Sequence, residues 1–218
     1  MSKYLLIIRR GGFIIKKSEK TKQKIMESTI EIVGRKGYAA TSTREIAESA
    51  GISEATIFKY YNSKNQLLES IVSNVIDDFY KYSINEAIPE VLSDSEEKNS
   101  QQMLNELITE RLSFFNENYQ AIQVILQEMM INESIREIFN KKIWTEIKSI
   151  SNNIFEKGKE ENQIRDIDSF HLRKALFGMI FYTFTFEQLL DTENIENYEH
   201  QEEAEKIIDI LFNGIGRD

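Results

Sequence analysis

The sequence contains no cysteine and only one proline among its 218 residues. Without cysteine the chain forms neither disulfides nor thiolate metal sites, which fits a reducing compartment. Nine glycines and one proline are few for this length, because sheet proteins spend more of both on turns. The composition therefore predicts an all-helical fold, built as one large domain or as a small domain joined to a larger one.

The residues that catalysis and metal binding need are also scarce. The only two histidines, His171 and His200, are far apart and lack the spacing of a metal site. The sequence has no G-x-S-x-G motif and no P-loop, and NGIGRD at 213–218 is a lone G-x-G with no helix after it. We therefore expect no catalytic residues, no metal and no cofactor, and a function that depends on binding.

Long apolar runs are absent as well. The only candidate for an export signal is YLLII, from Tyr4 to Ile8, which stops at Arg9. This run is too short for a signal core or a membrane span. We expect a soluble cytoplasmic protein without a membrane partner.

Charge is divided unevenly along the chain. Residues 1–70 hold 13 Lys and Arg against 7 Asp and Glu, whereas residues 71–218 hold 14 against 29. A basic N-terminal third on an acidic body is typical of a phosphate-binding module attached to a domain that does not bind phosphate. An ordinary uneven surface remains the alternative.

The basic part reads as a series of short helices. A first helix is predicted over Glu19–Lys36, ending at Gly37. Ser42 and Glu45 form an S-x-x-E capping box that begins a second helix, which Gly51 ends. Ser53 caps a third helix over Glu54–Tyr60, and a second box at Ser63 and Gln66 begins a long fourth helix from Lys64 towards Ile88.

The second and third helices are joined by a short turn with a glycine, which is the pattern of a helix-turn-helix. Ala47 is small enough for a close crossing of the two helices, and Ile46, Ile52 and Ile57 supply a small core. Because residues four apart share a face of a helix, Tyr61 is expected to point inward with Ile57 and Phe58 outward. A plain helical hairpin is the alternative.

The run from Lys24 to Leu68, including GYAATSTREIAESAGISEATIFKYYNSKNQLL, resembles the DNA-binding domain of the TetR family of bacterial transcriptional regulators. The resemblance implies an N-terminal three-helix DNA-binding domain, a helical C-terminal domain that binds a small effector, and a homodimer. Phe58 departs from the family pattern, which usually has tyrosine there, so a hydroxyl bond to phosphate is lost.

We expect the exposed face of the third helix to enter the major groove of DNA. In this interpretation Lys59 donates to guanine or phosphate, Tyr60 to phosphate, and Glu54 either accepts from cytosine N4 or turns towards a lysine. Thr43 and Lys64 are further phosphate candidates, with capping and solvent exposure as their alternatives. The predicted DNA-binding residues are Thr43, Ser53, Glu54, Ala55, Thr56, Phe58, Lys59, Tyr60 and Lys64.

The predicted domains are a basic arm at 1–18, a DNA-binding domain at 19–66 and a ligand-binding and dimerisation domain at 67–218. The lysines at 16, 17, 20, 22 and 24 could follow phosphate or a minor groove. A disordered tail, or a start codon placed too far upstream, explains the arm equally well.

The acidic remainder is predicted to be helical throughout, after a loop that Pro89 introduces at 91–100. The expected helices are Gln101–Asn116, Tyr119–Met130, Glu133–Lys159, Ser169–Leu190 and Gln201–Asn213. The last two are apolar enough to pair with a partner subunit as a four-helix bundle, or to cover the core of their own chain. The predicted dimer residues are Leu176, Ile180, Ile207, Leu211 and Phe212.

Interior aromatic and methionine side chains are candidates for the lining of an apolar effector pocket, with core packing as the alternative for each. They are Phe114, Phe115, Tyr119, Met129, Met130, Trp144, Phe177, Phe181 and Phe184. Glu128 and Glu187 are carboxylates in apolar surroundings, which indicates a cationic or hydrogen-bonding ligand or an exposed helix edge.

These features favour a ligand-responsive regulator, a repressor in most members of the family it resembles, that binds a palindromic operator as a homodimer. Its expected partners are duplex DNA, a small and largely apolar effector, and a second copy of itself. The alternatives are an all-helical protein-interaction module and a constitutive DNA-binding protein without an effector.

Overall fold

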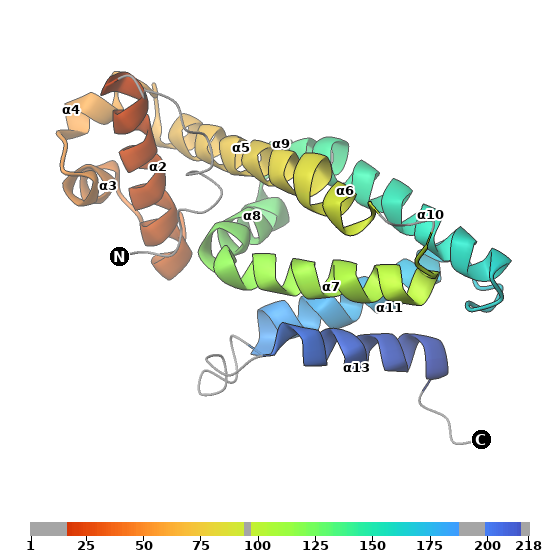
Figure 1. Ribbon diagram of the computed structural model, residues 1–218. Helices are drawn as coiled ribbons and strands as arrows, with labels where there is room; N and C mark the ends of the chain where they lie inside the picture. Colours follow the sequence, from red (N-terminus) through yellow and green to blue (C-terminus); the bar gives the residue numbers. More distant parts are fainter. Residues whose placement is uncertain (1–16, 94–96, 188–198, 215–218) are drawn as a thin grey trace. The chain divides into compact units, whose positions relative to one another are not determined.

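The computed structural model describes residues 17–93, 97–187 and 199–214 (Figure 1). These residues form helices joined by turns, and no strand occurs among them, which confirms the predicted all-helical fold. None of the described helices has the length and apolarity that a membrane crossing requires. The described residues divide into two compact units, one formed by 17–82 and 117–144, the other by 83–93, 97–116, 145–187 and 199–214.

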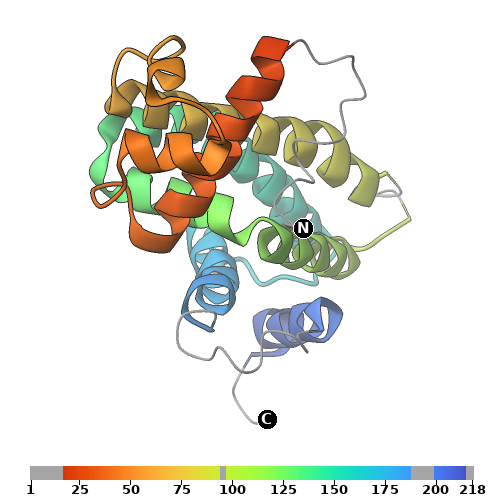
Figure 2. The same cartoon turned by 90° about the vertical axis from the view of Figure 1, so that its left-hand side faces the viewer.

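The first unit contains the predicted helix-turn-helix. Its helices are α2 (Lys17–Lys36), α3 (Thr43–Ala50), α4 (Glu54–Ile57), α5 (Lys64–Tyr82), α8 (Tyr119–Ile131), α9 (Glu133–Phe139) and the π-helical turn η2 (Asn140–Trp144). Helix α2 packs on α3 and α8, and α5 packs on α8 and α9. Figure 2 shows the short helices that follow α2 grouped beside it, coloured orange.

Buried aliphatic side chains hold the three N-terminal helices together. Ile25, Ile46 and Ile57 are almost fully buried, one from each helix. Ala47 is buried as well, as a close crossing of α3 and α4 requires, whereas Ile52 is only half-buried and contributes less to this core than expected. Each fully buried isoleucine contributes about 1.5–3 kcal/mol relative to an exposed one.

The second unit is a helical bundle with its own core. Its elements are η1 (Ser83–Ala87, a π turn), α6 (Ile88–Val91), α7 (Ser100–Glu117), α10 (Thr145–Glu160), α11 (Ser169–Tyr182), η3 (Thr183–Glu187, a π turn) and α13 (His200–Asn213). Leu104, Ile108, Ile154 and Leu176 are buried in one cluster with side chains of α13.

The end of α10 folds back tightly on itself. The carbonyl of Gly158 accepts hydrogen bonds from the backbone N–H groups of Gln163 and Ile164, at 2.8 and 3.0 Å. Asn162 turns the chain with a φ of 57°. The hydroxyl of the fully buried Ser100 donates to the side chain of Gln163 at 2.7 Å. Gly158 therefore lies where two other segments approach the helix directly.

Several predicted helices differ from the structure in where they end or in their continuity. The helix predicted over Glu54–Tyr60 ends at Ile57, because the N–H groups of Lys59 and Tyr60 bond to carbonyls three residues back, which tightens the last turn. The helix from Lys64 runs through η1 and α6 to Val91, so Pro89 lies inside a helix rather than after it.

The π turn η1 explains how the helix from Lys64 continues past Pro89. A proline inside an α-helix removes one ladder hydrogen bond and crowds the carbonyl four residues before it, here that of Asn85. Asn85 lies in η1, where the ladder is already rearranged. Likewise, the single helix predicted over Glu133–Lys159 is interrupted by η2, for which the sequence has no recognisable signal.

Candidate nucleic-acid interface

The turn between α3 and α4 has the predicted local chemistry. Ser42 caps α3 by accepting from the N–H of Glu45, and the Glu45 carboxylate accepts from the N–H of Ser42, which confirms the capping box. Gly51 ends the helix at a φ of 66°, a left-handed conformation that glycine adopts without strain. Because the N–H of Ile52 bonds to the carbonyl of Ala47 at 3.0 Å, the turn is fixed by backbone hydrogen bonds.

Glu45 also connects α3 to the end of α2. The Lys36 ammonium lies 2.5 Å from the Glu45 carboxylate. This hydrogen bond, with those from the backbone and hydroxyl of Ser42, lowers the pKa of Glu45 from 4.5 to about 2. The carboxylate therefore stays ionised, and its network stays intact, in mildly acidic solution.

The free energy of unfolding is expected to decrease as the pH is lowered from 4.5 to about 2, because Glu45 becomes protonated in this range. Since its pKa is depressed in the folded state, its contribution is complete above pH 4.5 and is lost as pH falls towards about 2. Urea denaturation of the wild type and of Glu45→Gln at several pH values measures this. The two curves should converge in that window, whereas Glu31→Gln, which removes an exposed carboxylate of α2, should run parallel to the wild type.

The three rings that follow α4 have different environments. Tyr61 is 7% exposed and packs in the core with Ile57, whereas Phe58 is 48% exposed, as the helical spacing predicts. Tyr60 is half-buried, with the Lys22 ammonium 5.9 Å from its ring centroid. Ala55 and Lys59 are exposed beside Phe58. The residues expected to face DNA are thus accessible, and their contacts with DNA stay a prediction.

Of the predicted DNA-binding residues, Ser53 caps α4 and bonds to Thr56 within that helix. The Ser53 hydroxyl accepts from the N–H of Thr56 at 3.3 Å, and the two hydroxyl oxygens are 2.8 Å apart. Ser53 is exposed and Thr56 half-buried. Both hydroxyls are therefore oriented by the cap, and Ser53 confirms its predicted role as the residue that begins this helix.

Glu54 and Thr43 interact across the turn, which the sequence did not indicate. The Thr43 hydroxyl, at the start of α3, donates to the Glu54 carboxylate at 2.5 Å. Within the described part of the chain Glu54 makes no ion pair, so it does not turn towards a lysine, one of its two expected states. The proton of Thr43 that a phosphate would accept is directed at Glu54 instead.

Lys64 is fixed rather than freely exposed. Its ammonium donates to the carbonyl of Tyr38 at 2.8 Å and lies 4.1 Å from the centroid of that ring. The Tyr38 hydroxyl donates in turn to the Asn65 side chain at 2.5 Å. These contacts join the α2–α3 turn to the start of α5. The second capping box forms in part. The backbone N–H of Gln66 donates to the Ser63 hydroxyl, but the Gln66 side chain accepts from the backbone N–H of Asn62.

The candidate effector residues fall in both units. Phe114, Phe115 and Phe184 come together in the second unit, with centroid distances of 6.2 Å between the first two and 5.2 Å between the last two. Phe177 there is half-buried. Phe181 is 45% exposed, so the prediction that it is interior is wrong: it directly follows the buried Ile180 and a residue one step along a helix points about 100° away.

The first unit holds the other candidates. Tyr119, Met129 and Trp144 are half-buried, whereas Met130 is 83% exposed and not interior. Glu128 is only 3% exposed, and burial raises its pKa, so the exposed-edge interpretation does not apply to it. The side chain of Glu187 lies outside the described residues.

Arg111 is a half-buried cation that sequence reasoning missed. Its guanidinium lies 4.9 Å from the Phe114 centroid and donates to the Ser83 hydroxyl at 2.6 Å. It also pairs with Glu110. The available signal was an arginine between Ile108 and Leu112, on a helix whose neighbouring positions are apolar.

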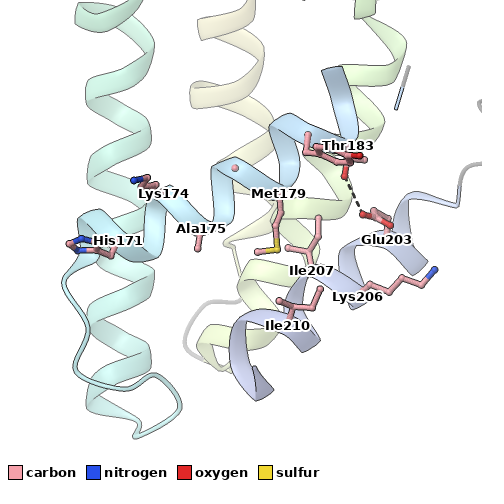
Figure 3. Close-up of a pocket in the computed structure, with 11 residues that line it drawn as sticks. His171, Lys174, Ala175, Met179, Thr183, Glu203, Lys206, Ile207 and Ile210 are labelled. Atoms are coloured by element: carbon pink, nitrogen blue, oxygen red, sulfur yellow. Dashed lines mark hydrogen bonds between the residues drawn. The ribbon is translucent and has the colours of Figure 1, made fainter. Parts of the chain in front are cut away.

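The predicted dimer residues are largely used inside the chain. Leu176, Ile180 and Ile207 are buried in the core of the second unit, and Leu211 and Phe212 pack against it, as the alternative interpretation expects. The open surface of α11 and α13 is a groove whose lining includes only Ile207 of these five residues. Figure 3 shows Met179, Lys206 and Ile210 along it, with the Thr183 hydroxyl donating to Glu203 at 3.2 Å. Tyr182 at 55% exposure and Ile210 at 45% are its exposed apolar members.

A capped helix, a glycine turn and a short second helix followed directly by the exposed Phe58 and Lys59 define a DNA-binding protein of the helix-turn-helix class. Residues 25–71 match the family model for bacterial regulatory proteins of the tetR family. The chain belongs to the TetR family of transcriptional regulators.

Relatives extend this likeness beyond the helix-turn-helix. A probable helix-turn-helix transcriptional regulator of Bacillus subtilis, YttP, is 31% identical over 144 residues, which cover 66% of this chain and 67% of YttP. The structure of FadR from Bacillus subtilis in complex with stearoyl-CoA matches with a TM-score of 0.65 at 23% identity, covering 89% and 99% of the two chains. AibR in complex with isovaleryl coenzyme A and operator DNA matches with a TM-score of 0.69 at 16% identity, covering 88% and 98%.

Proposed function

We propose that this protein is a cytoplasmic transcriptional repressor that binds a palindromic operator as a homodimer and releases it when a small effector binds. The observation that carries the proposal is the exposed surface formed by Ala55 of α4 and by Phe58 and Lys59 directly after it, next to the turn at Gly51. This geometry suits insertion into a major groove, and the basic balance of the first 70 residues suits the phosphates around it.

A homodimer is the assembly that suits a helix of this kind. Two copies related by a two-fold axis can place two recognition helices about 34 Å apart, on successive major grooves. We assign the dimer contact to the groove of α11 and α13, with Met179, Tyr182 and Ile210 as its apolar centre. Tyr182 and Ile210 are exposed, whereas Leu176 and Ile207 are buried in the core of the same unit.

For the effector we favour an acyl chain carried by coenzyme A. FadR and AibR, which share this fold, are each described with such a ligand. The cluster of Phe114, Phe115 and Phe184 in the second unit offers an apolar lining, and Arg111 beside it offers a cation for a polar group. Effector binding would release DNA only if the ligand prefers the conformation that does not fit the operator.

Selection of bound sequences from a random duplex pool tests the DNA part of this proposal. We expect a palindrome with half-sites about one helical turn apart, and an affinity that falls steeply as salt rises because counterions are released. Lys59→Ala should weaken binding roughly tenfold, and should lower the salt slope by about 1 if Lys59 contacts phosphate. Stearoyl-CoA added to the complex should release the selected duplex, whereas free coenzyme A should not.

Lys81→Ala is the matched control for Lys59→Ala. Lys81 is an exposed lysine near the end of α5 that pairs with Asp78, so its loss removes the same charge away from the α4 turn and from the groove of α11 and α13. DNA affinity of this variant should equal that of the wild type. Affinity that does not depend on salt, or a pool from which no sequence is enriched, would instead favour a protein-interaction module. A selected duplex that no acyl-CoA releases would favour a constitutive binder.

A further inference from the structure

The hydrogen bond between Thr43 and Glu54 places an oriented carboxylate on the face expected to meet DNA. Glu54 is the first residue of α4 and is exposed, next to the exposed Ala55. The Thr43 hydroxyl holds it at 2.5 Å from the first residue of α3. A negative charge is unfavourable near phosphates, so a carboxylate kept in this position calls for a specific acceptor role.

We infer that Glu54 reads a cytosine in each half-site by accepting a hydrogen bond from its exocyclic N4 amine, and that Thr43 is the positioning residue for this contact. The inference rests on the proposed function, because it requires the α4 face to enter the major groove. Glu54 is thus assigned to sequence discrimination rather than to affinity. Thr43 is assigned to position Glu54 rather than to contact a phosphate.

The base preference follows from what each base presents in the major groove. Guanine presents the acceptors N7 and O6, and thymine presents O4 and a methyl group, so neither can donate to a carboxylate. Cytosine and adenine both present an amine, but adenine also places the N7 lone pair beside it. The Glu54 side chain, as an acceptor, therefore favours cytosine, accepts adenine less well, and rejects guanine and thymine.

The hydroxyl of Thr43 makes this preference sharper than a free glutamate would. An exposed glutamate side chain samples several rotamers, and ordering it on binding opposes the contact. The bond from Thr43 fixes the carboxylate before DNA arrives and leaves its other acceptor positions open. Thr43 and Glu54 lie 11 residues apart on different helices, so the turn at Gly51 is what brings them together.

Glu54→Gln gives a test with a directional result. An amide both donates and accepts, and glutamine pairs with N6 and N7 of adenine. Selection from a random duplex pool should therefore show one symmetric position of the wild-type palindrome where cytosine is preferred roughly tenfold over guanine or thymine. In Glu54→Gln the preference at that position should move to adenine, by a similar factor. Thr43→Val, which keeps the shape and removes the hydroxyl, should reduce the cytosine preference at the same position without moving it.

Glu31→Gln is the control for the loss of one negative charge. It neutralises an exposed glutamate of α2 and should leave the base preference at every position unchanged. The inference fails if the wild type selects a palindrome whose base preferences are the same in Glu54→Gln, which would leave Glu54 as a brace between α3 and α4. Failure of the proposed function is a separate result, in which the wild type enriches no duplex at all.

Discussion

Tyr61→Ala is expected to lower the free energy of unfolding by about 3–5 kcal/mol, the usual range for removing a buried aromatic side chain. Tyr61 is 7% exposed and packs beside Ile57, which is fully buried. Burial also raises the pKa of its hydroxyl. Urea denaturation followed by circular dichroism measures the loss, and the melting temperature should fall with it.

Phe58→Ala is the matched control for this substitution. Phe58 is 48% exposed, three residues before Tyr61, and its removal should change the free energy of unfolding by about 0.5 kcal/mol or less. Its effect should appear in DNA affinity instead, if the ring contacts a sugar or a thymine methyl. Equal losses of stability in the two variants would contradict the assignment of one ring to the core and the other to the surface.

Gly158→Ala is expected to destabilise the second unit by about 1–3 kcal/mol through overpacking. A Cβ at this position would lie 2.6 Å from both the Ser100 Oγ and the Ile164 Cδ1. Neither neighbour can move freely, because Ser100 is fully buried and bonded to Gln163, and the N–H of Ile164 bonds to the carbonyl of Gly158 itself. Thermal unfolding followed by circular dichroism checks the result.

Gly178→Ala provides the comparison within the same unit. Gly178 is also helical, in α11, and nothing lies within 4 Å of a Cβ built there. Alanine should therefore raise stability by up to about 1 kcal/mol through helix propensity. Opposite signs for the two substitutions are the expected result. A stabilising Gly158→Ala would mean that the chain around 161–164 relaxes away from α10.

The features that the sequence predicts well are local. The capping box of Ser42 and Glu45, the left-handed Gly51 and the opposite faces of Phe58 and Tyr61 each depend on residues at most four apart. Over such distances the spacing of residue types determines hydrogen bonds and burial almost directly. The fold class and the helix-turn-helix follow from these features together.

The features that the sequence did not predict depend on tertiary contacts. Thr43 and Glu54 are 11 residues apart, and Lys64 and Tyr38 are 26 apart, so neither pair leaves a pattern in the sequence. The exposure of Phe181 is set by which face of α11 the core accepts. The assignment of individual residues to DNA, effector and dimer contacts stays a prediction until the experiments above are done.

The π turns have a consequence for the tolerance of the chain to insertions and deletions. A π turn closes its hydrogen bonds one residue later than an α turn, so η1 at Ser83–Ala87 holds about one residue more than a regular helix needs. Deleting one residue there would let the turn close as a regular α-helix and would leave the following side chains of α6 on about the same faces, whereas deleting a residue within α5 would rotate them by about 100°. We therefore expect η1 to be the place in this helix where loss of one residue still leaves Ile88 in the core and Glu90 in solvent.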